Sequence, residues 1–333
     1  MRFSIIIPVS DADTYLEQSI DHCLNLNYPD YEIILLPDKP IPEPSSFRVI
    51  PTVNPSPSVK RNVGIQNAQG EICAFIDADA YPTQDWLEKA DQHFNDPQVA
   101  AVGGPNLTPD EDTEMQKAAG FILAFPLGGG TPKRFSPAPL HECDELQSVN
   151  MLIRKSVLEE IGGFDSGLWP GEDAKLSYQI KKMKMKMIYS PEIIVYHHRR
   201  PLFRQFLKQL WNYGITKPLA IKRHMSFRHL FYVIPTLFLL GLITGPILFQ
   251  WLPSLRIVYF SILGFYVAGL LWSTRRPPTV KMKAATFTGI FLMHITYGFA
   301  FLIGLFRKGS TIEDNDNLSP SRQYGESAIN FSK

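Results

Sequence analysis

The chain has 333 residues, with 33 basic and 32 acidic side chains. This length accommodates one large catalytic domain and something smaller beside it. The near balance of charge provides no global basic field, so the composition excludes a strongly basic nucleic-acid-binding protein. The three cysteines, Cys23, Cys73 and Cys143, form no CxxC or Cys/His zinc spacing, and we interpret them as reduced structural thiols.

The first hundred residues alternate between strand and helix signals. Continuous apolar runs predict buried strands, and apolar residues at helical spacing predict the helices between them. The expected strands are Phe3–Ile7, Tyr31–Leu36 and Ile72–Ile76, and the expected helices are Tyr15–Leu26 and Val59–Ala68. Such alternation is typical of a parallel sheet with helices on both faces, in which ligands bind at the carboxyl ends of the strands.

Acidic side chains follow two of these strands. Asp38 comes after the second strand, and Asp77-Ala78-Asp79 comes after the third. Two acids one residue apart at a strand end suit Mg²⁺ or Mn²⁺, which take oxygen ligands and can bridge a diphosphate. A later pair, Glu172-Asp173, opens an amphipathic run and can supply a catalytic base, although acids at this position also suit a plain helix cap. Together the two clusters indicate transfer of a sugar from a nucleotide donor.

The middle of the chain is less regular. Residues 106–149 contain Gly128–Pro132 and Ser136–Pro139, which predict a long loop that is either a lid, an acceptor-binding segment or disordered. Order returns afterwards, with helices expected near Arg154–Ile161 and Ala174–Met183 and a strand near Ile193–Tyr196.

The last third of the chain has the pattern of a membrane region. Pro201–His229 is basic with interleaved apolar residues, which suits a helix on a membrane surface or an amphipathic helix packed on the domain. Three uncharged runs follow, Phe231–Phe249, Ile257–Thr274 and Ala285–Phe306. Each has about 18 to 22 residues, enough to cross a hydrocarbon core of about 30 Å. We therefore predict three transmembrane helices.

Basic residues indicate the orientation of these helices. One side is flanked by Arg223, Arg228, Arg275, Arg276, Lys281 and Lys283, whereas the turn Gln250–Arg256 carries only Arg256. By the positive-inside rule the catalytic domain is cytoplasmic, in a bacterial-type inner or plasma membrane. Three spans place the tail outside, but Arg307-Lys308 then lie on the unfavourable side. The predicted divisions are a catalytic domain (1–200), an amphipathic interfacial segment (201–229), the spans (230–307) and a polar, disordered tail (308–333).

Six motifs occur in an order that resembles a known family. They are Ser4-Ile5-Ile6-Ile7-Pro8, Tyr28-Pro29-Asp30-Tyr31-Glu32-Ile33-Ile34, Lys60-Arg61-Asn62-Val63-Gly64, Gly70–Asp79, Gly162-Gly163-Phe164-Asp165 and Gly171-Glu172-Asp173. Over roughly residues 3–215 this series is similar to the family 2 inverting glycosyltransferases. The resemblance implies the GT-A fold, a Rossmann-like α/β domain with a mixed sheet and helices on both faces, here followed by an all-α membrane region.

The resemblance also implies roles for individual residues. Asp38 matches the aspartate that binds the donor's base, although the family usually has two consecutive acids where this chain has Pro37-Asp38. Ser10-Asp11 likewise replaces the family's usual Tyr-Asn. Asp79 matches a metal ligand. The expected donor-binding residues are Pro8, Asp11, Asp38, Arg61, Asp77 and Arg200.

The remaining roles concern the base and the metal. The family base is the aspartate of the acidic pair, which is Asp173 here, with Glu172 orienting it or binding the acceptor. His197 matches a histidine that completes the metal site in related enzymes better than His198 does. The expected cofactor is a divalent cation, Mn²⁺ or Mg²⁺.

The predicted activity is that of a single-addition hexosyltransferase. Gln209-Leu210-Trp211 lacks the arginine of the Gln-x-x-Arg-Trp signature of processive members. We predict transfer of one sugar from a UDP- or GDP-sugar to a lipid-linked saccharide in cell-surface glycan (polysaccharide) biosynthesis. The alternatives are a polyprenyl-phosphate glycosyltransferase and a catalytically inactive membrane scaffold.

Overall fold

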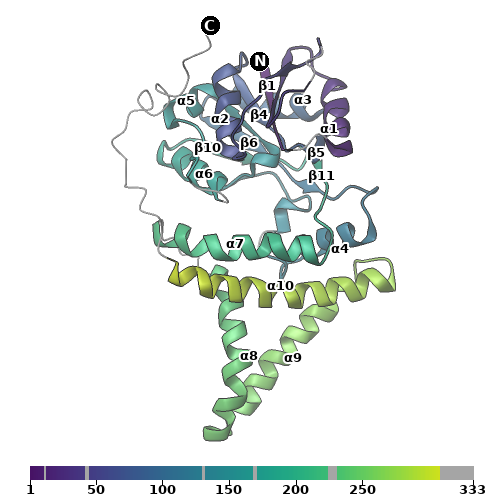
Figure 1. Ribbon diagram of the computed structural model, residues 1–333, viewed down its shortest axis with the longest axis vertical. Helices are drawn as coiled ribbons and strands as arrows, with labels where there is room; N and C mark the ends of the chain where they lie inside the picture. Colours follow the sequence, from purple (N-terminus) through teal and green to yellow (C-terminus); the bar gives the residue numbers. More distant parts are fainter. Residues whose placement is uncertain (11–12, 42–44, 130–131, 168–170, 224–230, 308–333) are drawn as a thin grey trace.

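The computed structural model of the chain describes all residues except 11–12, 42–44, 130–131, 168–170, 224–230 and 308–333. An α/β region made by the first 200 residues stands above a helical region (Figure 1). This arrangement confirms the predicted fold class, an α/β domain followed by an all-α region. The expectation for the tail falls outside the described residues.

The central sheet has eight strands in the described part of the chain, in the order β3-β2-β1-β4-β9-β6-β10-β8. Their bounds are β1 Phe3–Val9, β2 Tyr31–Pro37, β3 Arg48–Val49, β4 Ile72–Phe75, β6 Val99–Gly103, β8 His141–Glu142, β9 Met151–Arg154 and β10 Lys186–Tyr189. The predicted strands β1, β2 and β4 are confirmed and pair in parallel. The sheet is mixed rather than purely parallel, because β9 runs antiparallel between β4 and β6.

A smaller sheet has the order β5-β11-β7. Its strands are β5 Ala80–Pro82, β7 Asn106–Leu107 and β11 Val195–His197. The strand expected near Ile193–Tyr196 therefore lies slightly later than predicted. Its partner β5 directly follows the Asp77-Ala78-Asp79 segment, and the antiparallel register places His197 opposite Ala80.

Helices cover both faces of the central sheet. In the α/β region their bounds are α1 Thr14–Leu24, α2 Pro57–Asn67, α3 Trp86–Asp91, α4 Glu114–Leu123, α5 Lys155–Ile161 and α6 Glu172–Lys182. Helix α4 lies in the stretch predicted to be irregular, where a capping box between Thr113 and Gln116 starts it. The helix expected from Arg154 begins one residue later, after β9.

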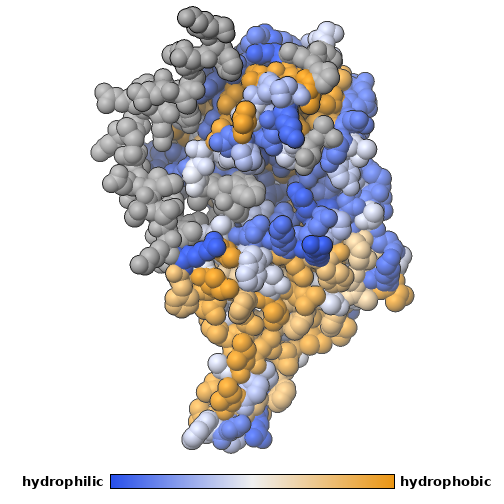
Figure 2. All heavy atoms as spheres, in the orientation of Figure 1, coloured by the Kyte–Doolittle hydropathy of each residue, from blue (hydrophilic) through white to orange (hydrophobic). Residues whose placement is uncertain are grey.

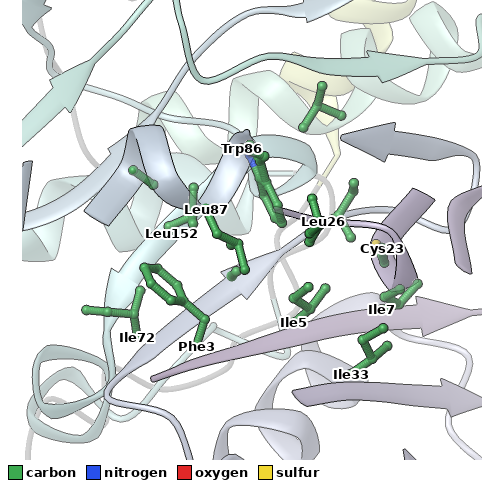
Figure 3. Packing of buried hydrophobic residues seen from close by; sticks show 14 of the residues in the cluster. Phe3, Ile5, Ile7, Cys23, Leu26, Ile33, Ile72, Trp86, Leu87 and Leu152 are labelled. Carbon is green, nitrogen blue, oxygen red and sulfur yellow. The ribbon is translucent and has the colours of Figure 1, made fainter. Parts of the chain in front are cut away.

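Two apolar clusters, one on each face of the sheet, form the core. Alternate residues of β1 point to opposite faces, as the two-residue period of a strand requires. Phe3, Ile5 and Ile7 belong to one cluster with Trp86 and Leu87 of α3, and Ile7 lies at its Cys23 end (Figure 3). On the other face Ile6 packs with residues of α2, α5 and α6, among them Ile65, Leu158 and Leu176. Because both faces of β1 are buried, its sequence is a continuous apolar run.

The helical region consists of α7 Arg204–Arg223, α8 Ile234–Trp251, α9 Leu255–Ser273 and α10 Val280–Phe306. A third apolar cluster joins it to the α/β region through residues of α4, α7 and α10, including Ile122, Phe206 and Ile290. Phe231–Trp251, Leu255–Ser273 and Val280–Phe306 are long and apolar enough to cross a membrane. Figure 1 shows α8 and α9 running away from the α/β region, whereas α10 lies alongside α7.

Candidate active site

The acidic segment after β4 meets the end of β11 at one edge of the fold. Asp77, Asp79 and His197 each offer a ligand atom within 4.8 Å of the others. The Nε2 atom of His197 lies 3.2 Å from Oδ1 of Asp79, because the register of β11 on β5 brings the histidine beside the acid. Two carboxylates and one imidazole are a donor set that suits Mn²⁺.

Neighbouring side chains keep Asp79 ionised. Burial favours its neutral form, but His197, by charge and hydrogen bonding, and Arg200 outweigh burial and hold the pKa of Asp79 at about 2. The Arg200 guanidinium is 3.9 Å from the second oxygen of Asp79, and 58% of its side chain is exposed. It therefore remains accessible for a further anionic group. His198 points elsewhere: its Nδ1 lies 2.6 Å from Asp112, and its ring stacks on Tyr15.

Arg61 links this edge to the second acidic cluster. Its guanidinium donates to Oδ1 of Asp77 at 2.8 Å and to Oε1 of Glu172 at 3.1 Å. Only 4% of the Arg61 side chain is exposed, and its guanidinium stacks over the ring of Phe164. The sequence predicts that Arg61 binds the sugar donor. In the structure its guanidinium lies inside the protein and connects the Asp77 and Glu172 carboxylates.

Asp173 has the environment of a base. The backbone N–H of Ser148 donates to its Oδ2 at 3.2 Å, and its Oδ1 has no hydrogen-bond partner among the described residues. Burial, followed by the charge of Glu172, raises the pKa of Asp173 to about 7, although Arg61 and Ser148 act in the opposite direction. A carboxyl group with a pKa near neutrality is suited to accept a proton from a substrate.

Glycine and asparagine shape the loop before α6. Gly163 has φ +79°, and a Cβ there would lie 2.4 Å from Oδ1 of Asn62. The Asn62 side chain can therefore bind the Phe164 backbone twice, donating to its carbonyl and accepting from its N–H, both at 2.8 Å. Gly171, at φ +131°, precedes the acidic pair, and its backbone N–H donates to the Glu172 carboxylate. These contacts fix the backbone at Phe164 and at Gly171, the residue before the acidic pair.

The expected base-binding aspartate has a buried partner. Asp38 follows β2, and Nζ of Lys60 lies 2.7 Å from its Oδ1. Lys60 is 2% exposed and also donates to the Val9 carbonyl, so it connects the ends of β1 and β2. Pro8 lies near the end of β1, while Asp11 lies outside the described residues. Sequence reasoning assigned no role to Lys60, Asn62 or Ser148, although Lys60 and Asn62 stand in the motif that contains Arg61.

The sequence of the chain is similar to those of known glycosyltransferases. Residues 4–162 match the family model "Glycosyl transferase family 2". A relative from Methanococcus voltae, a dolichyl N-acetyl-alpha-D-glucosaminyl phosphate 3-beta-D-2,3-diacetamido-2,3-dideoxy-beta-D-glucuronosyltransferase, is 25% identical over 336 residues, covering 93% of this chain and 99% of that protein. Glycosyltransferase AglE from Haloferax volcanii is 24% identical, covering 63% of this chain and 71% of that protein.

A solved structure shares the fold. The mannosyltransferase PcManGT from Pyrobaculum calidifontis, in complex with GDP-Man and Mn²⁺, matches with a TM-score of 0.53 and 17% identity, over 91% of this chain and 86% of that one. The family model, the relatives along the chain and the mixed sheet lead to the same assignment. The chain is a glycosyltransferase whose residues 4–162 match a family 2 domain, with a GT-A-type fold followed by apolar helices.

Proposed function

We propose that the protein is an inverting glycosyltransferase that transfers one sugar from a nucleoside-diphosphate sugar to a lipid-linked saccharide during cell-surface glycan synthesis, with its catalytic domain in the cytoplasm. The proposal depends on one observation: Arg61 connects Asp77 with Glu172, and these two acids belong to groups with different chemistry. Asp77 belongs to a cluster suited to a cation, and Glu172 adjoins a carboxyl group suited to proton transfer.

The first group fits a divalent cation. Asp77, Asp79 and His197 would hold Mn²⁺ or Mg²⁺, which offsets the charge that develops on a leaving nucleoside diphosphate. The histidine favours Mn²⁺, and the related mannosyltransferase structure contains Mn²⁺ with GDP-Man. Arg200, exposed beside Asp79, supplies a second positive charge for the diphosphate. Asp38, which follows β2 and pairs with Lys60 of α2, would bind the donor's uracil or guanine base.

The second group supplies the base. Asp173 accepts the proton of an acceptor hydroxyl as that oxygen forms a bond to the anomeric carbon. The bond from this carbon to the diphosphate oxygen breaks on the opposite face, so the configuration inverts. Glu172 stays fixed by Arg61 and by the N–H of Gly171, and its charge helps to keep the Asp173 pKa near 7.

The environment of Asp173 favours a saccharide hydroxyl over a lipid phosphate as the acceptor. A phosphate is already anionic at neutral pH and needs no base, whereas a hydroxyl must lose a proton. A partly buried carboxyl group with a raised pKa and one oxygen without a hydrogen-bond partner among the described residues serves the second case. The relative from Methanococcus voltae carries in its name a sugar linked to dolichyl phosphate, which supports a lipid-linked saccharide here.

The test is a transfer assay with full-length protein in membranes. Radiolabelled UDP- and GDP-sugars are supplied with Mn²⁺ and either a polyprenyl-diphosphate monosaccharide or plain polyprenyl phosphate. We expect label on the monosaccharide acceptor, released by mild acid as a disaccharide. Label on polyprenyl phosphate alone would instead support the polyprenyl-phosphate enzyme, and no transfer with any donor would support an inactive scaffold.

Matched variants connect the assay to the site. Asp79→Ala removes one expected cation ligand and should abolish most transfer. Asp110→Ala changes an exposed acid outside the cluster and should leave transfer unchanged. Equal activity of the wild type with and without a chelator would contradict the role of the cation.

A further inference from the structure

Helix α10 differs from the other two apolar helices in its direction. Figure 1 shows α8 and α9 as a hairpin directed away from the α/β region, whereas α10 lies alongside α7, across the ends of the hairpin nearest that region. With 27 residues, α10 is about 40 Å long at 1.5 Å per residue. Its length and hydropathy alone would permit a third span, so its neighbours decide its orientation.

Small residues lock α10 against α7. Gly214 of α7 meets α10 so closely that an added Cβ would lie 2.7 Å from the Cβ of Ala300. An added Cβ at Gly304 would lie 2.5 Å from the carbonyl oxygen of Ile215. Nearer the start of α10, Gly289 faces Leu202, just before α7. In these contacts, later residues of the α7 segment meet later residues of α10, so the two helices run parallel in close contact.

Helix α10 is also attached to the α/β region. Lys281 Nζ lies 2.8 Å from Glu114 in the first turn of α4, and the Thr279 hydroxyl donates to the same carboxylate at 3.1 Å. Further along, His294 Nε2 lies 2.8 Å from the carbonyl oxygen of Leu127, which follows α4. Tilting α10 relative to the α/β region would break these contacts and the apolar cluster that α10 shares with α4.

If α10 crossed the bilayer, α7 would have to enter it too, because the two helices lie side by side. Arg204 and Lys208, in the first turns of α7, are exposed, and placing charged side chains against hydrocarbon is costly. The hairpin has an apolar surface instead, because Ile257, Phe260 and Phe265 are exposed along α9. A bilayer crossed by the hairpin covers these side chains and leaves the charges of α7 in water.

The surface polarity marks where such a bilayer would lie. In Figure 2 the hydrophilic surface of the α/β region gives way to hydrophobic surface at the level of α7 and α10, and polar residues return at the tip of the hairpin. Helices α8 and α9, of 18 and 19 residues, are each about 27–29 Å long, close to the hydrocarbon thickness. Trp251 and Trp272 stand at the two ends of the hairpin, as interfacial aromatics do.

Basic residues stand at both ends of α10. Arg275, Arg276 and Lys281 lie at its start, Arg307 follows its last residue, and the hairpin turn carries only Arg256. The positive-inside rule favours both ends on one side of the membrane. We infer that α7 and α10 lie in the plane of a lipid bilayer surface, that only the α8–α9 hairpin crosses the bilayer, and that α10 ends on the same side as the α/β domain.

The test is cysteine accessibility in the full-length protein in membranes. Cys23, Cys73 and Cys143 are replaced, and single cysteines are introduced by Glu160→Cys on α5, Ser254→Cys at the hairpin tip and Arg307→Cys after α10; all three positions are exposed. A membrane-impermeant maleimide is then applied to intact spheroplasts and to inverted vesicles. None of these positions belongs to the proposed active site, and labelling does not depend on catalysis.

The two topologies predict opposite results at one position. We expect Glu160→Cys and Arg307→Cys to be labelled from the same side, and Ser254→Cys from the other. Three spans would instead place Arg307→Cys on the side of Ser254→Cys, which overturns the inference. Labelling of all three positions from one side would exclude a crossing hairpin. Extraction by alkaline carbonate as a detergent-free oligomer would show that another copy of the chain, rather than lipid, covers the apolar surface.

Discussion

Replacing the proposed base should make the protein less active and more stable. Asp173→Asn keeps the size of the side chain and its bond from the Ser148 N–H, but removes proton acceptance. General-base catalysis contributes about 10²–10⁴-fold, so turnover should fall by that factor while nucleoside-diphosphate affinity stays within about threefold. The same substitution removes a partly buried charge that the fold accommodates at a cost.

The raised pKa sets the size of the stability gain. Burial and Glu172 raise the pKa of Asp173 from 3.8 to about 7. Each pKa unit corresponds to about 1.4 kcal/mol, so the charged form destabilises the fold by at most about 4 kcal/mol. Because the folded state binds the proton more tightly than the unfolded state, the cost is absent below about pH 4, grows with pH, and is complete above about pH 7.

The assay compares thermal unfolding of the full-length protein in detergent at pH 5 and pH 8. Asp173→Asn should raise the melting temperature at pH 8 by up to about 8–16 °C, at about 2–4 °C per kcal/mol for a domain of this size, and by clearly less at pH 5. Asp110→Asn, at an exposed position, is the control and should change neither value. An equal gain at both pH values, or none at pH 8, would refute the assignment of a partly buried Asp173 that is charged at a cost to the fold.

Three further substitutions test the surrounding contacts. Arg61→Met leaves the Asp77 and Glu172 carboxylates without their shared cation, so the free energy of unfolding should fall by about 3–5 kcal/mol. Because Arg61 lowers the pKa of Asp173, the same substitution should move the acidic limb of the kcat/KM profile to higher pH. An unmoved limb would mean that Arg61 does not act on the base. His197→Gln should weaken Mn²⁺ binding about tenfold or more in a titration, with an unchanged melting temperature without metal; unaltered affinity would remove His197 from the site. Gly163→Ala places a Cβ against Asn62 at positive φ and should destabilise the fold by about 1–3 kcal/mol in denaturant unfolding, whereas a neutral effect would show that the loop relaxes.

Local signals predicted the parts of the fold that have strong periodicity. The apolar runs of β1, β2 and β4 are confirmed because strands buried on both faces are continuous in sequence. Strand β9 escaped prediction because its short run, Met151–Arg154, borders a helical pattern, and only tertiary pairing places it between β4 and β6. The alternation of lysine and methionine in Lys184–Met187 was a strand signal for β10, but it follows directly on a helix.

The order of the motifs predicted part of the candidate site. Asp79 and His197 were predicted as metal ligands, Asp79 from its place after β4 and His197 from the family resemblance, and the structure brings them together. Asp77 was predicted to bind the donor, but its carboxylate lies in the same cluster. The burial of Arg61 could not be predicted, because a helical arginine carries no sign of which face it occupies. The partnership of Lys60 with Asp38 depends likewise on the neighbouring ends of β1 and β2.

Calorimetric titration of GDP and UDP tests the central claim most directly, with Mn²⁺ or with a chelator. The proposed site predicts that one of the two nucleotides binds wild-type protein in Mn²⁺, and that chelator or Asp79→Asn removes most of this binding. Asp110→Asn should bind as the wild type does. Equal affinity in Mn²⁺ and in chelator, or full binding by Asp79→Asn, would contradict a cation held by Asp77, Asp79 and His197.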